Sequence, residues 1–500
     1  MIEPFDKSGV KRGPDGIARY DNLAGSLVEM LGLTVARYPK GEAIVEIGGE
    51  RIDYTSLWER AARVAGGLHA MNIGRGDRVA IQLGNGLDWC LAFFGIQLSG
   101  AIAVPVNTRF APPEVEYVLG DSGSSYSFRP GESLLDGPPF VAEGIDAEDV
   151  SAIFYTSGTT GFPKGAMTTH ANFLTNVENC HRIGPLSKDD RIRTLVSVPL
   201  FHVTGCNSQL LFATSCGGTT VILPAFTVQG FLDAIVAERT DSVTSVPAIH
   251  WLAINQPQFK DLDVSHVRFV FYGGAPIAPE LVLRLMAAYP KARVGNGFGL
   301  TETSSVSTFL PHEYSSTNAD SVGFPAPVVD LDLLEPDAET GVGELLVRGP
   351  NIVKGYWNKP EATQAAFVNG WLHTGDMARI SDEGFVYIVD RKKDMINRGG
   401  ENVYCVEVEN ALAAHPSVFE VAVIGVADLV MGEKVGAVIV TRPGAEVTAA
   451  EILAFARENL ADFKVPQYLI LRSDPLPRNP GGKIVKPVLR KTVEWGTPIR

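Results

Sequence analysis

The sequence lacks an excess of basic residues, and this excludes the functions that depend on one. Its 43 lysines and arginines are outnumbered by 57 aspartates and glutamates, which gives the 500-residue chain a formal net charge of −14. Binding to nucleic acid or to an anionic membrane surface relies on a broad basic face, so neither is expected. Any phosphate that this protein binds must therefore be held by a local cluster of donors.

Cysteine is also scarce, and its pattern fits neither zinc nor disulfides. The five cysteines stand at positions 90, 180, 206, 216 and 405, without a C-x-x-C pair. An odd number of scattered cysteines indicates free thiols in a reducing compartment. The first residues, MIEPFDKSGVKRG, contain acids and no apolar stretch, so we expect a cytoplasmic protein without a signal peptide.

A run with the composition of a membrane helix is missing too. The longest uncharged run, WCLAFFGIQLSGAIAVPVNT from Trp89 to Thr108, could span a bilayer by its length alone. A buried helix that stops at Gly100, followed by a buried strand, explains it better, so we expect no integral membrane association. The residues that argue against a membrane span are Gln97, Ser99, Gly100, Pro105 and Asn107.

What is present is an alternation of short apolar strands with amphipathic helices. The order recurs in DRVAIQL, LDWCLAFFGIQL and AIAVPV, and again in RFVFYGG, PELVLRLMAAYP and ARVGNGF. Strand, helix and strand in that order predict parallel sheets covered on both faces. We therefore expect an α/β protein with two doubly wound sheets, one before and one after residue 155. The Ser-, Gly- and Pro-rich residues 121–145 are interpreted as a surface connection.

The pattern changes from about Val328 onward. Short strands with turn signals, such as GELLVRG and FVYIVD, predict a small antiparallel or barrel-like region. A C-terminal module follows, with a helix expected from about Tyr404 to His415 and a capping box from Thr448 to Glu451. We assign residues 1–390 to a large N-terminal domain and residues 391–500 to a small, mobile α+β domain.

The stretch YTSGTTGFPKG, from Tyr155 to Gly165, has the composition of an anion-binding loop. Glycines let backbone N–H groups turn inward, and the hydroxyls and the lysine add donors and positive charge. The stretch does not match the common phosphate loop G-x-x-x-x-G-K-[ST], because Pro163 and Gly165 replace the second glycine and the hydroxyl. On composition alone, an ordinary hairpin turn stays an alternative.

Further motifs follow this loop along the chain. They are PLFHVTG (199–205), YGGAP (272–276), GFGLTET (297–303), WLHTGD (371–376), DRKKDMINRGGENVY (390–404) and PRNPGGK (477–483). With them the chain resembles the adenylate-forming superfamily of acyl-CoA synthetases, adenylation domains and luciferases over nearly its whole length. The resemblance is greatest to bacterial fatty-acid and aryl-acid CoA ligases. It implies that a carboxylic acid and MgATP give acyl-AMP and pyrophosphate, and that CoA then gives the thioester and AMP.

The resemblance also implies which residues hold the phosphates and the metal. The glycine-rich loop would bind the β- and γ-phosphates, Thr301 would contact the α-phosphate and Glu302 would ligate Mg²⁺. An exposed Glu at a helix start is the alternative for Glu302. Lys483 would bridge the attacking carboxylate and the α-phosphate as a mobile cation. The loop residues concerned are Thr156, Ser157, Gly158, Thr159, Thr160, Gly161 and Lys164.

A nucleoside site is implied as well. The backbone of the YGGAP motif would approach the adenine, with a plain strand-to-helix turn as the alternative. Phe298 stands where the family usually has tyrosine, and its ring can still stack on the base. Asp376 would accept hydrogen bonds from the ribose hydroxyls, and Arg391 would assist from the far side. The residues on the adenine side are Gly274, Ala275 and Pro276.

In this family the C-terminal domain rotates between the two steps, and the hinge maps to Lys393. After rotation, Gly399 and Gly400 would line the tunnel for the pantetheine arm of CoA, where a side chain would block the thiol. Arg398 replaces the small residue that is more usual before these glycines, which leaves the details of the tunnel open. Lys486, where the family more often has arginine, is expected to be a solvated lysine without a role.

The acyl-acid site is the least defined. In relatives the position of His202 borders the acyl carboxylate and can gate the pocket, and a packed core histidine is the alternative. Beyond it, residues recur at helical spacing that either face the acyl chain or form core. They are Val203, Cys206, Asn207, Leu210 and Leu211.

The residues together predict an ATP-dependent acyl-CoA ligase that uses ATP, Mg²⁺ and CoA and acts on a fatty, aryl or steroid-side-chain acid. An amino-acid adenylation domain is disfavoured, because His202 stands where such domains carry an aspartate. A luciferase-like monooxygenase would share the adenylation residues. A nucleotide-sensing relative without activity would have lost Lys483, Glu302 or Asp376, and all three are present. The oligomeric state is open between a monomer and a homodimer.

Overall fold

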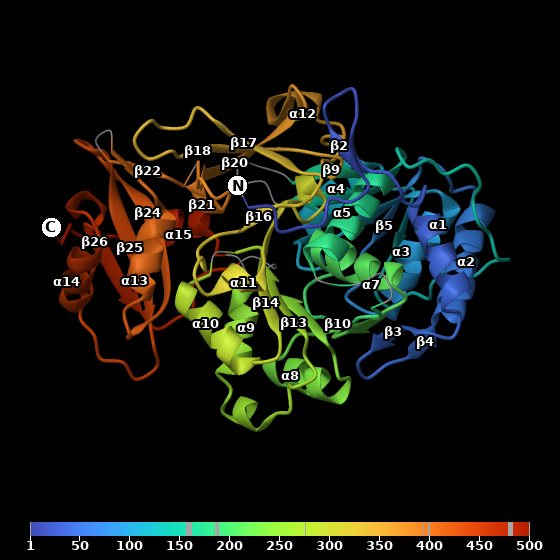
Figure 1. Ribbon diagram of the computed structural model, residues 1–500, viewed down its shortest axis with the longest axis horizontal. Coiled ribbons are helices and arrows are strands. Elements are labelled where there is room, and N and C mark those ends of the chain that lie inside the picture. Colours follow the sequence, from blue (N-terminus) through green and yellow to red (C-terminus); the bar gives the residue numbers. More distant parts are fainter. Residues whose placement is uncertain are drawn as a thin grey trace.

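The largest sheet crosses the lower part of Figure 1 and has the strand order β16-β15-β14-β13-β12-β10-β11-β3-β4. The computed structural model describes residues 2–156, 163–184, 186, 190–275, 277–392, 394–398, 401–478 and 484–499. The strands of this sheet are β3 (Glu42–Glu46), β4 (Arg51–Asp53), β10 (Arg193–Val196), β11 (Thr219–Ile222), β12 (Ser242–Ser245), β13 (Phe269–Gly273), β14 (Arg293–Phe298), β15 (Thr308–Leu310) and β16 (Phe324–Pro325).

The inner strands of this sheet are parallel and buried, as the apolar runs predict. Val243, Val270 and Val294 lie side by side on β12, β13 and β14, and each is 0 % exposed. Helices α8 (Val228–Ala237) and α10 (Pro279–Ala288) pack against them in one core cluster. At the edges the expectation of parallel strands is wrong, since β4, β15 and β16 pair antiparallel with their neighbours. The connection from β14 to β15 is too short for the crossover that parallel strands need.

A second sheet has the order β7-β5-β6-β8-β9. The run from Trp89 forms helix α3 (Leu87–Ser99), which is apolar on all sides and buried, so it packs against α2 (Tyr54–Ala70) and the sheet. Gly100 ends it in the left-handed conformation (φ +75°), and a buried strand follows as predicted. Among the described helices, none combines the length and apolar character that crossing a membrane requires. The strands are β5 (Arg78–Ile81), β6 (Ile102–Pro105), β7 (Tyr126–Phe128), β8 (Val150–Thr156) and β9 (Lys164–Thr169).

Two details of the predicted organisation are wrong. The sheets do not divide at residue 155, because β3 and β4 join the large sheet although they precede β5 in the chain. Residues 121–145 are more than a surface connection, since they include β7, an edge strand of the second sheet. Part of this segment also lies directly on α2, where a Cβ on Gly66 would stand 1.8 Å from the carbonyl oxygen of Pro138. Its polar composition concealed these tertiary contacts.

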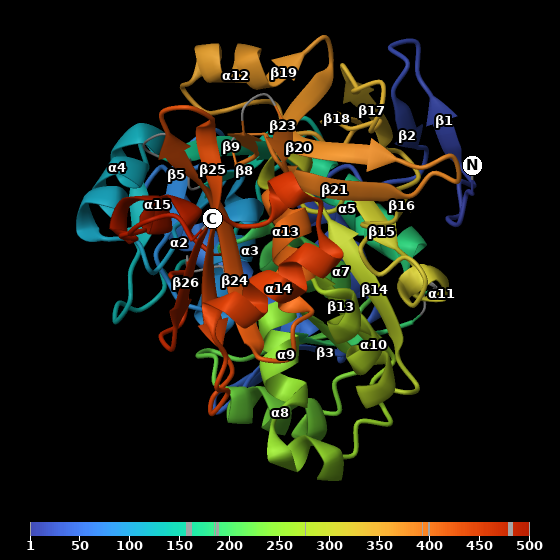
Figure 2. The ribbon, with the colours of Figure 1, turned by 90° about the vertical axis from the view of Figure 1, so that its left-hand side faces the viewer.

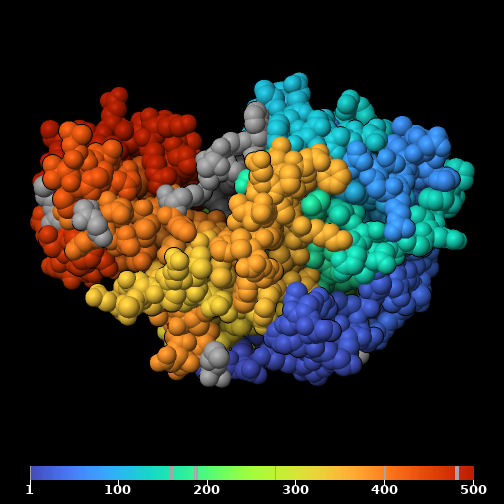
Figure 3. Space-filling view, turned by 90° about the horizontal axis from the view of Figure 1, so that it is seen from above, coloured from blue at the N-terminus to red at the C-terminus, as the bar shows by residue number. Residues whose placement is uncertain are grey.

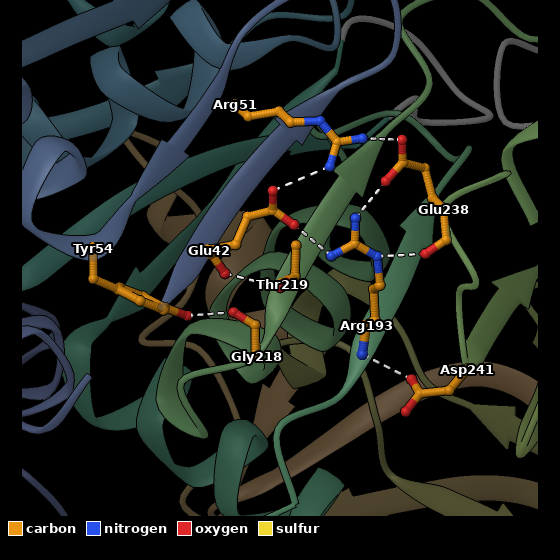
Figure 4. A network of polar contacts seen from close by, with 8 residues as sticks. All are labelled: Glu42, Arg51, Tyr54, Arg193, Gly218, Thr219, Glu238 and Asp241. Atoms are coloured by element: carbon orange, nitrogen blue, oxygen red, sulfur yellow. Dashed lines mark hydrogen bonds and ion pairs between the residues drawn. The ribbon is translucent and has the colours of Figure 1, made fainter. Parts of the chain in front are cut away.

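Alternating charges connect the strands at the end of the large sheet where β3, β10 and β11 begin (Figure 4). Arg193 donates to Glu42 at 2.5 Å and also pairs with Glu238, and Arg51 pairs with the same two carboxylates. The backbone N–H of Arg193 donates to Asp241 at 2.7 Å. This network therefore joins three strands and the end of α8 on the side opposite the carboxyl ends of the strands.

The third sheet is the small antiparallel region that the sequence predicts. Its order is β17-β18-β20-β19, with β21 paired to β20. A register shift between Met377 and Ala378 follows directly after Asp376. The strands are β17 (Asp330–Leu334), β18 (Gly343–Arg348), β19 (Phe367–Val368), β20 (Trp371–Ile380) and β21 (Val386–Arg391).

The residues after β21 form a separate layer, here named the C-terminal unit, on the left of Figure 1 and facing the viewer in Figure 2. Seen from above, the surface is hollowed between this unit, in red, and the cyan part of the chain (Figure 3). Its helix α13 (Cys405–Ala413) lies where expected, and the capping box is confirmed at Thr448 and Glu451. Its remaining elements are β22 (Ile396–Arg398), β23 (Glu401–Val403), β24 (Val418–Asp428), β25 (Gly432–Thr441), α14 (Ala449–Asn459), β26 (Tyr468–Arg472) and α15 (Lys486–Thr492).

Candidate active site

Several of the sequence motifs meet at the carboxyl ends of neighbouring parallel strands. Strands β13 and β14 pair in parallel up to Gly273 and Gly297, so the YGGAP and GFGLTET motifs leave the sheet side by side. Strand β10 ends on the same edge and leads through the PLFHVTG motif to His202. This edge of an open α/β sheet is where ligands bind in such folds. The sequence therefore places its chemical groups where the topology leaves room for a substrate.

The glycines of YGGAP fit a close approach. A Cβ on Gly273 would stand 2.1 Å from the carbonyl oxygen of Gly297, so the strand pair tolerates no side chain there. Gly274 has a φ of +74°, and a Cβ on it would meet no atom within 4 Å. This backbone is thus exposed and unobstructed, as contact with a flat base requires. Ala275 lies beside it, partly exposed, and Pro276 is outside the described residues.

Thr301 and Glu302 lie in a one-turn 3-10 helix, Thr301–Thr303, directly after β14. The next two residues have unusual backbone for serine, with φ +54° at Ser304 and +109° at Ser305. Such conformations cost free energy and persist only where surrounding contacts impose them. A Cβ on Gly299 would stand 1.4 Å from the Ser305 carbonyl oxygen, so the turn folds back tightly on the strand end.

Buried amides hold this strained turn from another element. The Asn207 amide donates to the Ser304 carbonyl oxygen, and the Ser208 hydroxyl bonds to that of Ser305 at 2.8 Å. Asn176 accepts the backbone N–H of Val306 at 2.9 Å. These contacts keep the turn that presents Glu302 in one conformation. The motifs did not identify the three polar residues as supports, and the burial of Asn176 and Asn207 becomes visible only in the structure.

Tyr356 connects two of the predicted site residues. Its hydroxyl donates to Glu302 Oε1 at 2.7 Å, and the ammonium of Lys164 lies 4.9 Å from the centre of its ring. The backbone N–H of Trp357 donates to the carbonyl oxygen of Gly165 at 2.7 Å, which fixes the neighbouring tyrosine against β9. Burial and the neighbouring Glu302 charge raise the pKa of Tyr356 above its usual range, so the phenol stays a donor. The sequence analysis missed this residue.

Lys164 itself begins β9, opposite Thr156 at the end of β8. The two strands pair antiparallel, so the flanks of the glycine-rich stretch form a hairpin. This pairing agrees with an anion-binding loop and equally with an ordinary hairpin turn. The loop opens at the carboxyl end of β8, as an anion-binding loop should. Ser157, Gly158, Thr159, Thr160 and Gly161 lie outside the described residues.

Asp376 and Arg391 form a pair within the small antiparallel sheet. They are register partners on β20 and β21, and the Arg391 Nε lies 2.6 Å from Asp376 Oδ1. The side chain of Asp376 is 3 % exposed and that of Arg391 is 40 % exposed. A carboxylate held in this way is oriented before any ligand arrives. Phe298, on β14, is half-buried and packs against the neighbouring core cluster.

His202 and the residues after it form an irregular helix. His202 is half-buried and precedes a short turn, and its ring centre is 4.9 Å from that of Phe201. The expected α-helical spacing is wrong, because Cys206–Leu211 form a π-helix, a form that is common at functional sites. The members of the stripe are buried, and most belong to a core cluster with α2 and α3, as the core interpretation predicted. They are Val203, Cys206, Asn207, Leu210 and Leu211.

The predicted residues of the C-terminal motifs are described only in part. Lys483, Lys393, Gly399 and Gly400 lie outside the described residues. Lys486, expected to be solvated, is instead buried, and its ammonium lies 2.9 Å from Glu409 Oε1 of α13. Its side chain is only 14 % exposed, so the interpretation of Lys486 as a solvated lysine is wrong. A helix-start lysine that folds inward against another helix leaves no periodic signal in the sequence.

Known families and proteins match this chain over most of its length. The model described as AMP-binding enzyme matches residues 33–139 and 130–357, and that described as AMP-binding enzyme C-terminal domain matches residues 407–483. The chain is 36% identical over 494 residues to the long-chain-fatty-acid–CoA ligase FadD13 of Mycobacterium tuberculosis, covering 92% of this chain and 97% of that protein. It is 36% identical over 482 residues to the feruloyl-CoA synthase of an Amycolatopsis species, covering 91% and 97%.

A solved structure of similar fold is the o-succinylbenzoate CoA synthetase of Bacillus subtilis in complex with an acyl-adenylate intermediate. The TM-score is 0.83 at 27% identity, covering 94% of this chain and 98% of that chain. The same enzyme in complex with ATP and a magnesium ion gives a TM-score of 0.82 at 28% identity, covering 93% and 98%. The similarity therefore spans the large sheets and the C-terminal unit together.

Proposed function

Because the chain belongs to the AMP-binding enzyme family, we propose that it is an ATP-dependent acyl-CoA ligase. In the first step a carboxylate oxygen of the acid bonds to the α-phosphorus of ATP, and pyrophosphate leaves. In the second step the sulfur of CoA bonds to the acyl carbon, the thiol proton is released, and AMP leaves with the electrons of the broken C–O bond. Two anions meet in the first step, so fixed positive charge and donors must surround the phosphates.

The observation that carries this proposal is the alignment of Lys164, Tyr356 and Glu302. A cation from the glycine-rich hairpin lies 4.9 Å from the ring centre of one tyrosine, and a carboxylate from the strand end accepts the hydroxyl of the same tyrosine at 2.7 Å. Phosphates held beside Lys164 would thus be next to a group that binds Mg²⁺. Neither contact is explained by packing alone, because both are polar and lie at the carboxyl edge of the sheets.

The donor set fits magnesium. Mg²⁺ prefers oxygen ligands and is usually bound by one or two carboxylates together with substrate phosphates. Glu302 supplies such a carboxylate, and Tyr356 occupies only its Oε1. A bound Mg²⁺ would neutralise charge on the phosphates. Thr301, in the same turn, would donate to the α-phosphate, and the strained residues after it would keep both side chains in place.

The nucleoside would lie across the ends of β13 and β14. The open backbone at Gly274 and Ala275 suits the adenine, with the ring of Phe298 on the neighbouring strand. Asp376, oriented by Arg391, would accept hydrogen bonds from the ribose hydroxyls. A role in ribose binding explains why the carboxylate of Asp376 is buried while Arg391 beside it stays accessible.

The contacts near position 393 agree with two domains that rotate relative to one another. Arg391 pairs with Asp376, and Lys392 pairs with Glu344 at 3.0 Å, both in the antiparallel sheet. Asp394 instead pairs with Arg490 of α15 at 3.0 Å. The partners thus change from one side of Lys393 to the other, which supports a hinge there and a boundary near residue 390. Lys483 would serve the first step, and Gly399 and Gly400 would line the CoA tunnel in the second.

The substrate is a hydrophobic carboxylic acid in this proposal. The names of the relatives give a long-chain fatty acid in one case and ferulate in the other, and an apolar tunnel can hold either. His202 would border the acyl carboxylate, just before the turn that leads into the buried π-helix. We place the reaction in the cytoplasm, because five free thiols suit a reducing compartment.

The test is to incubate the protein with ATP, Mg²⁺, CoA and a fatty or hydroxycinnamic acid, and to follow AMP and the thioester. Equal amounts of AMP and thioester, formed only with all components present, are expected. ATP binding without AMP release for any acid would contradict the proposal and favour a nucleotide-sensing protein. AMP release that does not depend on CoA would indicate another acceptor.

A further inference from the structure

Asp390 is a buried carboxylate that the proposed chemistry does not use. It lies at the end of β21, is 2 % exposed, and precedes the two residues anchored to the antiparallel sheet. Its second carboxylate oxygen, unlike their side chains, contacts the C-terminal unit. A carboxylate on one side of a hinge with partners on the other side stabilises one arrangement of the two parts.

The first partner is the start of helix α13. Asp390 Oδ2 accepts the backbone N–H of Cys405, the first residue of that helix, while Oδ1 accepts the N–H of Arg391 at 2.7 Å. The residue that should cap the helix, Tyr404, makes no side-chain hydrogen bond to it. Asp390, on β21, therefore caps the N-terminus of helix α13, where the helix dipole favours negative charge.

The second partner is the buried ammonium of Lys486. It pairs with Glu409 at 2.9 Å. Burial raises the pKa of Asp390, and the Lys486 ammonium lies close enough to offset part of that rise. Burial is costly for a lone carboxylate, and a nearby ammonium and helix start offset that cost. Both groups belong to the C-terminal unit, so rotation about Lys393 would remove them from Asp390 together.

We propose that Asp390 is a positioning residue that locks the C-terminal unit in the arrangement for acyl-adenylate formation. The inference rests on the proposed function for its two steps. The assignment to the first step follows from Figure 1, where β22 lies at the upper left, apart from β13 and β14 at the lower centre. Strand β22, which precedes the glycines expected to line the CoA tunnel, is therefore away from the nucleotide site in this arrangement.

A second crossing contact is apolar and gives an independent comparison. The rings of Trp251, on α9 (Pro247–Ile254), and Phe419, on β24, meet edge to face with centres 4.8 Å apart. Rotation would separate these rings as well. Loss of the Asp390 contacts and loss of the ring contact should thus act in the same direction.

The test compares the two half-reactions in Asp390→Asn and Asp390→Ala. Asn keeps a hydrogen-bond acceptor of the same shape but removes the charge, whereas Ala removes both. We expect adenylation, measured by pyrophosphate exchange, to fall about tenfold in Asp390→Ala and less in Asp390→Asn. Thioester formation from preformed acyl-adenylate is expected to stay unchanged or to rise. Equal loss in both half-reactions, or no loss in either, would overturn the proposal.

The matched control is Asp394→Asn. This acid lies on the other side of Lys393 and pairs with Arg490 inside the C-terminal unit, so it does not cross the hinge. In this variant the ratio of the adenylation rate to the rate of thioester formation should equal that of the natural protein. Lys486→Met should give the same ratio of adenylation to thioester formation as Asp390→Asn. Lys486→Arg, which keeps the charge, should give the ratio of the natural protein. Failure of the arginine variant to restore the ratio would also count against the lock.

A distance measurement separates this inference from the proposed function. The five natural cysteines are buried, so probes can be attached selectively to introduced cysteines at the exposed positions Lys260 and Glu458. Asp390→Asn should broaden or shift the distribution of probe distances, and Asp394→Asn should not. An unchanged distribution contradicts the lock even if the enzyme is active. A shifted distribution in a protein without any ligase activity supports the lock and contradicts the proposed function alone.

Discussion

The Tyr356 hydroxyl donates a 2.7 Å hydrogen bond to the carboxylate of Glu302, although the two residues are 54 positions apart in the chain. The same tyrosine ring lies under the Lys164 ammonium. One side chain thus relates the expected phosphate-binding lysine to the expected metal ligand. The hydroxyl of this side chain contacts the carboxylate, and its ring face contacts the ammonium.

Tyr356→Phe should slow acyl-adenylate formation about tenfold and raise the Mg²⁺ concentration that gives half the maximal rate. The change removes a hydrogen bond to a charged group, which is worth about 1.5–3 kcal/mol, and leaves the ring below Lys164 in place. Pyrophosphate exchange at several Mg²⁺ concentrations measures both effects. Tyr387→Phe, which loses only a 3.0 Å contact with Asn318, should leave the magnesium dependence unchanged. A shared change in both variants would indicate a general loss of stability.

Lys483→Ala should slow adenylation about 10²- to 10³-fold and spare thioester formation from preformed acyl-AMP. A charge pair at about 4 Å and an effective dielectric of about 20 is worth roughly 4 kcal/mol before desolvation, which sets the scale of this loss. Single-turnover assays of each half-reaction measure the effect. A similar loss in both half-reactions would refute the division of labour between the two arrangements.

The network in Figure 4 should matter for stability and not for catalysis. Arg193→Met leaves Glu42 and Glu238 close together without their more buried partner, so we expect the free energy of unfolding to fall by about 2 kcal/mol. Arg51→Met removes an arginine that is 50 % exposed and should cost less than about 1 kcal/mol. Urea unfolding of both variants gives the comparison. A larger loss for Arg51→Met than for Arg193→Met would contradict this account of the network.

Acid should destabilise the fold through two buried histidines. Burial lowers the pKa of His170 and of His250 to about 4. In the unfolded chain a histidine is protonated below about pH 6.5, so the unfolded state binds more protons between about pH 6.5 and 4, and stability falls as the pH falls through that window. Each histidine contributes up to about 3 kcal/mol to this loss.

His250→Gln tests the acid effect. The His250 Nε2 lies 2.9 Å from the carbonyl oxygen of Phe271, and a glutamine amide can donate to that oxygen without titrating. The variant should lose less stability than the natural protein between pH 6.5 and 4, as measured by unfolding at each pH. An unchanged slope would show that burial does not lower the pKa of His250 in the folded protein, and would contradict this account.

The sequence predicted the parts of the fold that depend on local periodicity. Helix α3, its end at Gly100 and the following strand are examples, because each follows from apolar composition and one glycine. Strand β7 was missed because it pairs with β5, a distant segment of the chain. The antiparallel edge strands adjoin their partners in the chain, and they were missed because apolar runs indicate strands but not their direction. Distance along the chain also explains why the contacts of Tyr356, Asn207 and Lys486 were not predicted, since their partners lie 54, 97 and 77 positions away.

The candidate site divides in a similar way. The motifs identified groups expected to touch the nucleotide, such as Glu302 and Asp376, through resemblance and through their place after strands. The side chains that hold these groups do not recur in a motif, since a buried amide such as Asn207 has the same sequence signal as any polar residue in a helix. Only their burial and their contacts in the folded chain distinguish them.

ATP–pyrophosphate exchange with a panel of carboxylic acids tests the central claim most directly. Short, medium and long fatty acids, cinnamic acids, bile-type acids and amino acids should each be tried without CoA, and CoA should then be added while AMP and thioester are followed. The account predicts exchange with one class of hydrophobic acid, followed by CoA-dependent thioester. No exchange with any acid, in a protein that binds ATP, would contradict it.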